Sequence, residues 1–276
     1  MLEMFQQPFM LQSLIACLLL AGILSYFGVH VVTRGIVFID LALAQISSVG
    51  VAFALMSGND PRLFAVLFTL VGAFGISLIR TNDKRVPQEA VIGIIYAVSS
   101  ALSILMMAKV PHGDSDVVEI LFGNILAVTE PQIIQMSIVF GAVGLLHLIF
   151  HKQFKCQSMI QGENFGGQGT SLMNRWNILF YMSLALVISN AVGSSGVLQV
   201  FAYLIVPAVC ALLLFQRFGL VLFIAFIIAS LGSLAGLYSS YAYDLPTGAA
   251  IVACLGLIFM GCFGVKTLVF PKNGAN

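Results

Sequence analysis

The sequence predicts an all-α fold, a polytopic transmembrane bundle of eight or nine helices. Of the 276 residues, 60% are apolar and 8% are charged, and the mean hydropathy is +1.05. Soluble domains usually carry about 25% charged residues. Lipid cannot satisfy backbone hydrogen bonds, so apolar runs of about 17 to 25 residues are expected to cross it as helices. We expect residues 1–276 to form a single transmembrane domain.

Composition also excludes several classes of function. The formal net charge is +1 and no basic stripe with interleaved aromatic residues occurs, so no nucleic-acid partner is expected. The five cysteines show no CxxC spacing, which argues against a disulfide framework or a thiolate metal cage. The chain shows no nucleophile–base pair, HExxH motif or phosphate-binding glycine loop. We therefore expect a protein that is not an enzyme and binds no cofactor covalently.

Nine apolar runs are long enough to span a bilayer. The first run lacks the basic flank and the cleavage site of a signal peptide, so it is expected to be retained. Between the sixth and seventh runs, the glycine-rich VGSSG at 192–196 fits either a tight turn or an unwound break. The nine runs lie near residues 9–30, 36–57, 62–79, 88–109, 131–150, 175–193, 197–215, 218–238 and 247–268.

Lysine and arginine residues predict the orientation, because they are enriched in cytoplasmic loops. Only Arg62 and Lys109 fall in one set of alternate loops. The N-terminus is therefore expected outside and the C-terminus inside the cell. The opposite, cytoplasmic set holds Arg34, Arg80, Lys84, Arg85, Lys152, Lys155, Arg175, Arg217, Lys266 and Lys272.

The longest polar passage runs from Lys152 to Arg175 and is rich in glycine. It contains no apolar run that could cross a bilayer, so it is expected in the aqueous phase, on the cytoplasmic side. We interpret it as a docking surface for a soluble partner. On the opposite side, residues 109–131 fit either a short helix at the membrane surface or between spans, or an ordinary solvated loop.

Asp40 is an ionisable residue inside an apolar run, where a charge costs about 2.5 to 3.5 kcal/mol. On a helix, Asp40, Ser47 and Ser48 lie on adjoining turns, with Gln45 nearby. This polar stripe indicates the lining of a water-filled path. Alternatively, Asp40 lies near the cytoplasmic mouth and pairs with Arg34 or caps a helix.

Glu89 follows Pro87 by two positions at the start of a span. A proline and an acidic residue are both typical of the first turn of a helix, where the helix dipole favours negative charge. Glu89 is therefore interpreted either as a stabilising first-turn residue or as a second ionisable group of a transport path.

Five stretches together resemble the permease subunits of ABC importers for divalent metals, the zinc, manganese and iron class. The resemblance covers residues 14 to 265 and keeps the order and spacing of the stretches. They are GVHVVTRGIVFIDLALAQISSVGVAFAL (28–55), QEAVIGIIYAV (88–98), EILFGNIL (119–126), GVLQVFAYLIVPAVCALLL (196–214) and GLYSSYAYDLPTGAAIV (236–252).

The resemblance implies a homodimeric permease in the bacterial cytoplasmic (inner) membrane. It implies an extracytoplasmic substrate-binding protein as one partner and a cytoplasmic ATPase dimer, the subunit that uses ATP, as the other. Residues 152–175 would then be the coupling segment of the permease domain. The positions that match the coupling motif of the family are Glu163, Asn164, Phe165 and Gly169, without the arginine of the family pattern.

Besides the missing arginine of the coupling motif, the chain departs from the family pattern at positions that concern the cargo. The family commonly has an Asp and a His one helical turn apart, and Leu41 and Gln45 stand at these positions here. Asp40 stands one residue before Leu41, the position of the family's Asp, and therefore points about 100° away from it round a helix. Glu89 does match an acidic position of the family, so Asp40 and Glu89 are the candidate metal ligands. The cargo can be a divalent metal ion or a metal chelate, and an ion-coupled secondary transporter using Asp40 and Glu89 is the alternative function.

Overall fold

A computed structural model describes residues 7–79, 86–109, 123–163 and 171–269 of the protein. Within these ranges the regular structure is helical throughout, with no strand. In chain order the elements are α1 (Pro8–Arg34), α2 (Ile39–Ser57), α3 (Pro61–Leu78), α4 (Gln88–Met107), the 3₁₀ helix η2 (Ile125–Ala127), α6 (Glu130–Ile149), α7 (His151–Glu163), α8 (Ser171–Ser195), α9 (Val197–Leu214), α10 (Phe218–Tyr243) and α11 (Thr247–Val269).

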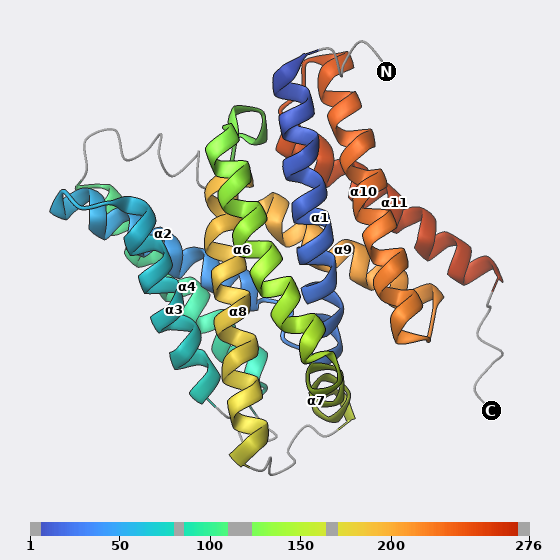
Figure 1. The fold of residues 1–276 in the computed structure, drawn as a ribbon, viewed down its shortest axis with the longest axis horizontal. Coiled ribbons are helices and arrows are strands. Elements are labelled where there is room, and N and C mark those ends of the chain that lie inside the picture. Colours follow the sequence, from blue (N-terminus) through green and yellow to red (C-terminus); the bar gives the residue numbers. More distant parts are fainter. Residues whose placement is uncertain (1–6, 80–85, 110–122, 164–170, 270–276) are drawn as a thin grey trace.

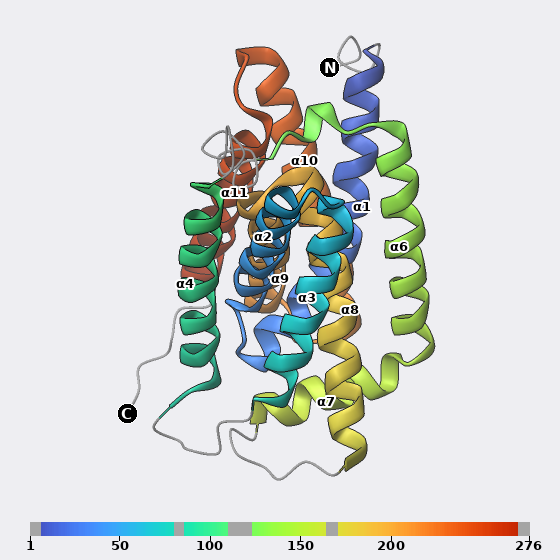
Figure 2. The ribbon, with the colours of Figure 1, turned by 90° about the vertical axis from the view of Figure 1, so that its left-hand side faces the viewer.

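Nine of the helices in the described ranges are long and apolar enough to cross a membrane, which confirms the predicted polytopic bundle. Of the described helices, α1, α6, α8 and α10 run along the bundle, α3 and α11 are inclined to it, and α7 differs from all of them (Figure 1). It has 13 residues and lies crosswise beneath them (Figures 1 and 2). We call the end of the bundle where α1 begins the upper end, and the end where α1 and α7 meet the lower end (Figure 1).

Helix α1 is central to the core and packs against α9, α10, α6 and α7. Its contact with α9 is close because residue 28 is glycine: a Cβ there would lie only 1.8 Å from the Leu204 carbonyl oxygen. Backbone approach of this kind holds membrane helices together, since lipid gives no hydrophobic drive between them. The second group of contacts joins α2 to α3 and α4, and α3 to α8.

Two glycines of α10 confirm the packing role that a GxxxG pattern predicts. A Cβ at Gly232 would meet the Leu255 side chain at 2.3 Å, and one at Gly236 would meet the Ile251 backbone at 2.4 Å. These two positions therefore allow α11 to lie directly on α10.

The join between α8 and α9 is a single residue. α8 ends at Ser195, and Gly196 has a φ of 79°, a backbone conformation that glycine adopts at little cost. Of the VGSSG sequence, residues 192–195 therefore belong to the last turn of α8 and the chain turns at Gly196 alone, so no unwound break occurs here.

Residues 123–129 cross the upper end of the bundle. Ile125 of η2 is 1% exposed, and its carbonyl oxygen accepts a hydrogen bond of 3.1 Å from the Ser13 hydroxyl of α1. Gly123 has a φ of 63° and lies against the backbone of Ser195. Ile125 and Val128 are buried whereas Asn124, Ala127 and Thr129 are exposed, so this part of the 109–131 segment packs on the bundle with one side only. Residues 110–122 lie outside the described ranges.

Candidate functional site

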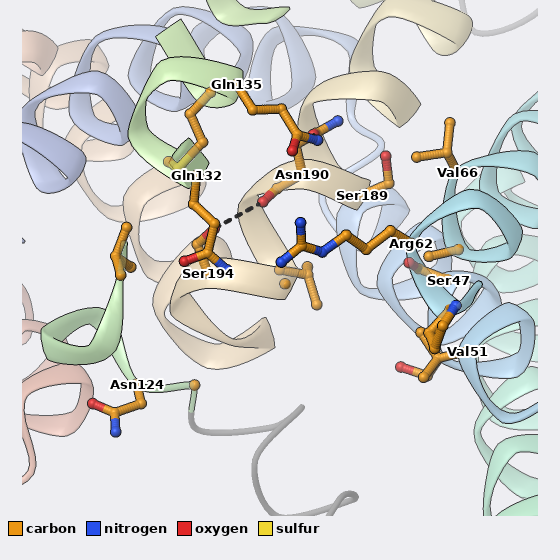
Figure 3. A pocket seen from close by; sticks show the side chains of 18 of the residues that line it. Ser47, Val51, Arg62, Val66, Asn124, Gln132, Gln135, Ser189, Asn190 and Ser194 are labelled. Carbon is orange, nitrogen blue, oxygen red and sulfur yellow. Dashed lines mark hydrogen bonds between the residues drawn. The ribbon is translucent and has the colours of Figure 1, made fainter. Parts of the chain in front are cut away.

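A cavity of about 420 Å³ lies towards the upper end of the bundle, between four helices. Its walls come from the second half of α2, the first turns of α3 and α6, the last turns of α8, and residues 123–128. Figure 3 shows the polar side chains that line it. We call this cavity the upper pocket.

Helices α6 and α8 supply amide and hydroxyl groups to the upper pocket. Gln135 Nε2 donates a hydrogen bond of 2.9 Å to Asn190 Oδ1, which joins the two helices. The Ser194 hydroxyl donates to the Asn190 carbonyl oxygen, so it stays on its own helix. Gln132 and Ser189 also line the pocket. These side chains offer both donors and acceptors to a ligand.

Arg62 is the one charged residue among the described residues that line the upper pocket. Its side chain extends across the pocket towards Asn190 and Ser194 (Figure 3). The neighbouring Asp60 is occupied as the N-cap of α3, where its Oδ1 accepts a 2.9 Å hydrogen bond from the Arg62 backbone amide. No hydrogen bond or ion pair joins the Arg62 guanidinium to any other residue that the structure describes.

The residues predicted to line a path are spread along the bundle. Ser47 and Ser48 line the upper pocket. Gln45 is buried on the same helix but does not line the pocket. Asp40 lies in the first turn of α2, towards the lower end, and Glu89 is half-buried in the first turn of α4. The structure places α4 against α2, but Asp40 and Glu89 share no site with the two serines.

Asp40 is 1% exposed, and its Oδ1 has no hydrogen-bond partner among the described residues. The proposed pairing with Arg34 does not occur. Arg34 Nε donates to Ser158, its Nη1 donates to Asn177, and its Nη2 has no hydrogen-bond partner in the described ranges. A buried carboxylate without a counter-charge is costly, so this position needs a reason other than an ion pair with Arg34.

Arg34 belongs to a second polar region at the lower end, which we call the α7 junction. The Ser158 hydroxyl of α7 donates to the Phe154 carbonyl oxygen at 3.0 Å, so its proton is used within α7. It must therefore accept both from Arg34 Nε, at 3.0 Å, and from His30 Nδ1, at 2.7 Å. One hydroxyl of α7 thus binds two side chains of α1.

His147 continues the α7 junction towards α6 and α8. The Ser183 hydroxyl donates to the Phe180 carbonyl oxygen, so His147 Nε2 must donate to Ser183, at 2.8 Å. Its Nδ1 then accepts from the Tyr26 hydroxyl at 3.1 Å, which assigns a neutral ring with the proton on Nε2. The ring also stacks on Phe154 at 4.0 Å. Both ring nitrogens are used in hydrogen bonds, which gives His147 a structural role.

The predicted coupling segment begins as helix α7. Ser158 is buried against α1, and Phe154 is buried among aromatic rings of α6 and α8. Lys155 and Cys156 are exposed. Glu163 is the last residue of α7. Asn164, Phe165 and Gly169 lie outside the described ranges, so their docking role stays a prediction.

No three His, Cys, Asp or Glu side chains come together as a metal-holding group within the described ranges. The candidate ligands Asp40 and Glu89 remain a prediction. Sequence reasoning missed Arg62, Gln132, Gln135 and Asn190 as pocket residues. The available signals were an asparagine inside an apolar span and two glutamines at i, i+3 in the first turns of a helix.

Comparison with known proteins gives matches along almost the whole chain. The ABC 3 transport family matches residues 6–266. The manganese transport system membrane protein MntC of Listeria innocua is 29% identical over 98% of this chain and 94% of that protein. The chelated iron transport system membrane protein YfeC of Yersinia pestis is 27% identical over 99% and 92%. Among solved structures, PsaBC from Streptococcus pneumoniae in complex with Fab matches with a TM-score of 0.78 and 26% identity, over 98% of this chain and 94% of that one.

Proposed function

Because the chain belongs to the ABC 3 transport family, as its five motifs predicted, we propose that it is the membrane-spanning permease subunit of an ABC importer. Its cargo is a divalent metal ion, namely zinc, manganese or iron, or a metal chelate, which it moves into the cytoplasm. The single observation that carries this function is the family match over residues 6–266. Two relatives named as manganese and chelated iron transport proteins support the cargo class.

The proposed location is the bacterial inner membrane, with the N-terminus outside and the C-terminus inside. The distribution of lysine and arginine supports this orientation. The upper pocket then faces the extracytoplasmic side and α7 faces the cytoplasm. Cys156 of α7 is exposed, and the other four cysteines lie in membrane-spanning helices, so Cys156 reports the orientation.

A membrane-impermeant maleimide should label Cys156 in inside-out vesicles and leave it unlabelled in sealed cells. The control is Asn59→Cys, an exposed position in the turn between α2 and α3, which should show the reverse pattern. Labelling of Cys156 from outside the cell would overturn the orientation and the docking role of α7 together.

The proposed partners are a cytoplasmic ATPase dimer, an extracytoplasmic substrate-binding protein and a second copy of this chain. ATP hydrolysis belongs to the separate ATPase subunit. Helix α7 supports the docking, because it lies crosswise at the lower end (Figure 2). Its residues Lys152, Lys155 and Cys156 are exposed. Residues 152–175 are the coupling segment of a permease domain that covers residues 1–276, with contacts from Glu163, Asn164, Phe165 and Gly169.

The proposed transport path follows α2 from the upper pocket towards the lower end. Ser47 and Ser48 line its beginning, and Gln45 and Asp40 follow on the same helix. Glu89 stands on α4, which packs against α2, and completes the pair of candidate metal ligands. A pathway should hold its cargo weakly enough to release it, so a site with few protein ligands suits transit rather than storage.

Reconstitution in proteoliposomes tests the function. We expect uptake of ⁵⁴Mn²⁺ or ⁵⁵Fe to need the ATPase subunit and ATP, and Phe165→Asp to reduce co-purification of the ATPase. The ion-coupled secondary transporter using Asp40 and Glu89 is the alternative, which the family membership does not favour. Uptake that is driven by a proton gradient without any ATPase subunit would establish that alternative instead.

A further inference from the structure

We propose that the upper pocket receives the cargo as an anionic metal chelate rather than as a bare divalent cation, with Arg62 as its cationic contact. This inference rests on the proposed import function and names the chemical class of the cargo. It starts from three properties of the upper pocket: the types of its side chains, the state of Arg62 and its size.

The side chains of the upper pocket are poorly suited to a bare metal ion. Divalent zinc, manganese and iron are bound in proteins mainly by carboxylate, imidazole or thiolate groups. The described lining residues include none of these groups and offer neutral amides and hydroxyls. Arg62 adds a positive charge, which would repel a bare cation at this place on the path.

Arg62 is suited to an anionic ligand. Its guanidinium presents a planar set of N–H donors that matches carboxylate oxygens in a two-point contact. Among the described residues no acceptor occupies these donors, and the nearby Asp60 carboxylate is bound to the backbone of α3. A guanidinium that extends into a cavity without a partner is therefore available to a ligand (Figure 3).

The polar groups around Arg62 can also bind an anionic chelate. Gln132 and Gln135 of α6 present amide groups to the pocket, and Ser47 presents a hydroxyl from α2. A chelate carries oxygen atoms around its metal, so it would accept hydrogen bonds from these groups while the metal stays with its own ligands. The volume of about 420 Å³ lies within the roughly 300 to 1,000 Å³ of small-molecule sites.

Binding to the full-length protein in nanodiscs tests the proposal. The probes are ⁵⁵Fe as ferric citrate and as ferric tris-catecholate, ⁵⁴Mn²⁺ as a bare cation, and metal-free ¹⁴C-citrate. We expect the wild type to bind at least one ferric chelate more tightly than the bare cation or the metal-free chelator. Arg62→Gln should lower the affinity for that chelate by about tenfold or more, because a charge-assisted contact is lost.

Two matched variants separate a specific contact from a general charge effect. Arg62→Lys keeps the charge but loses the two-point contact, so its chelate binding should lie between that of the wild type and that of Arg62→Gln. Lys109→Gln removes an exposed charge from the turn after α4, outside the pocket, and should leave binding unchanged. The melting temperature of each variant shows that it is folded.

Three results would overturn the proposal: tighter binding of ⁵⁴Mn²⁺ than of both ferric chelates, equal chelate binding by Arg62→Gln, or equal binding of metal-free citrate. The last result would make the pocket a site for the anion itself. These failures are distinct from failure of the proposed function. ATPase-dependent ⁵⁴Mn²⁺ uptake that is unchanged in Arg62→Gln keeps the importer and rejects the chelate, whereas chelate uptake without an ATPase rejects the importer.

Discussion

The upper pocket and the α7 junction each contain one arginine, and the two arginines differ in burial and in side-chain partners. Arg34 is 4% exposed and donates hydrogen bonds to Ser158 and Asn177, with its guanidinium carbon 3.6 Å from the centre of the Phe180 ring. Arg62 is exposed and has no side-chain partner among the described residues.

The difference shows how to separate structural from ligand-binding charges in a membrane protein. A charge within a span is expensive, so a structural one is surrounded by acceptors and an aromatic face that reduce the cost. Arg34 fits that description and joins α1, α7 and α8. Arg62 has no such surroundings, so we attribute its position in the pocket to recognition.

The largest expected effect is at the aromatic side of the α7 junction. Phe180 is fully buried and packs against Phe27, Phe154 and Arg34. Phe180→Ala should lower the free energy of unfolding by about 3 kcal/mol or more, because it leaves a cavity under the guanidinium. Thermal unfolding in detergent measures this loss.

The control for this variant is Phe223→Ala on α10, where the side chain is 60% exposed. It should cost far less, since few packed neighbours are lost. Equal destabilisation by the two variants would contradict the packing role of Phe180.

The two arginines can be compared directly by replacing each with methionine. Arg34→Met should lower the free energy of unfolding by about 2 kcal/mol, because Ser158 and Asn177 lose a charged donor. Arg62→Met should change it by less than about 0.5 kcal/mol, as expected for an exposed side chain. Melting temperatures that order the two variants the other way would refute the distinction between them.

A smaller effect is expected when only the hydroxyl of α7 is removed. Ser158→Ala deletes the acceptor shared by His30 and Arg34 and should cost about 1 to 2 kcal/mol. Hydrogen exchange should rise in α7 more than in α8, because the anchor of α7 on α1 is lost. Ser230→Ala is the control, since Ser230 is half-buried and its hydroxyl donates, among the described residues, only to the Phe226 carbonyl oxygen of its own helix. Unchanged exchange in α7 of Ser158→Ala would exclude the anchor.

The smallest effect on stability is expected at Asp40. Asp40→Asn removes a buried charge whose Oδ1 has no partner among the described residues, so the free energy of unfolding should change by less than about 0.5 kcal/mol. ATPase-dependent uptake should nevertheless fall by about tenfold or more if the carboxylate contacts the cargo. A parallel loss of assembly and uptake would show that Asp40 is structural.

The sequence alone was sufficient to predict the fold, because each membrane span can be recognised from the length of one continuous apolar run. All nine predicted runs correspond to described helices, with ends such as Tyr243 in place of residue 238 shifted by a few residues. Ser47 and Ser48 of the stripe on α2 line the upper pocket, and their role in a transport path stays a prediction.

The rest depends on contacts between distant parts of the chain. Arg34 and Ser158 are 124 positions apart, and nothing near either residue indicates the other. Arg62 resembles an ordinary loop charge until α6 and α8 are placed around it. A charge in a sequence is therefore interpretable only after its neighbours in space are known, which is why the Asp40–Arg34 pairing remained open and was then found absent.

Helix α8 belongs to both regions, since Asn177 and Phe180 are in the α7 junction and Asn190 and Ser194 line the upper pocket. Asn177 and Asn190 are 13 positions apart, which corresponds to roughly 20 Å of helix at 1.5 Å per residue. A rigid rod of this length that tilts by about 10° at one end shifts the other by about 3 Å, comparable to a hydrogen-bond length. A small displacement of α7 that tilts α8 would therefore break the Gln135–Asn190 hydrogen bond and change the shape of the upper pocket at the other end of α8.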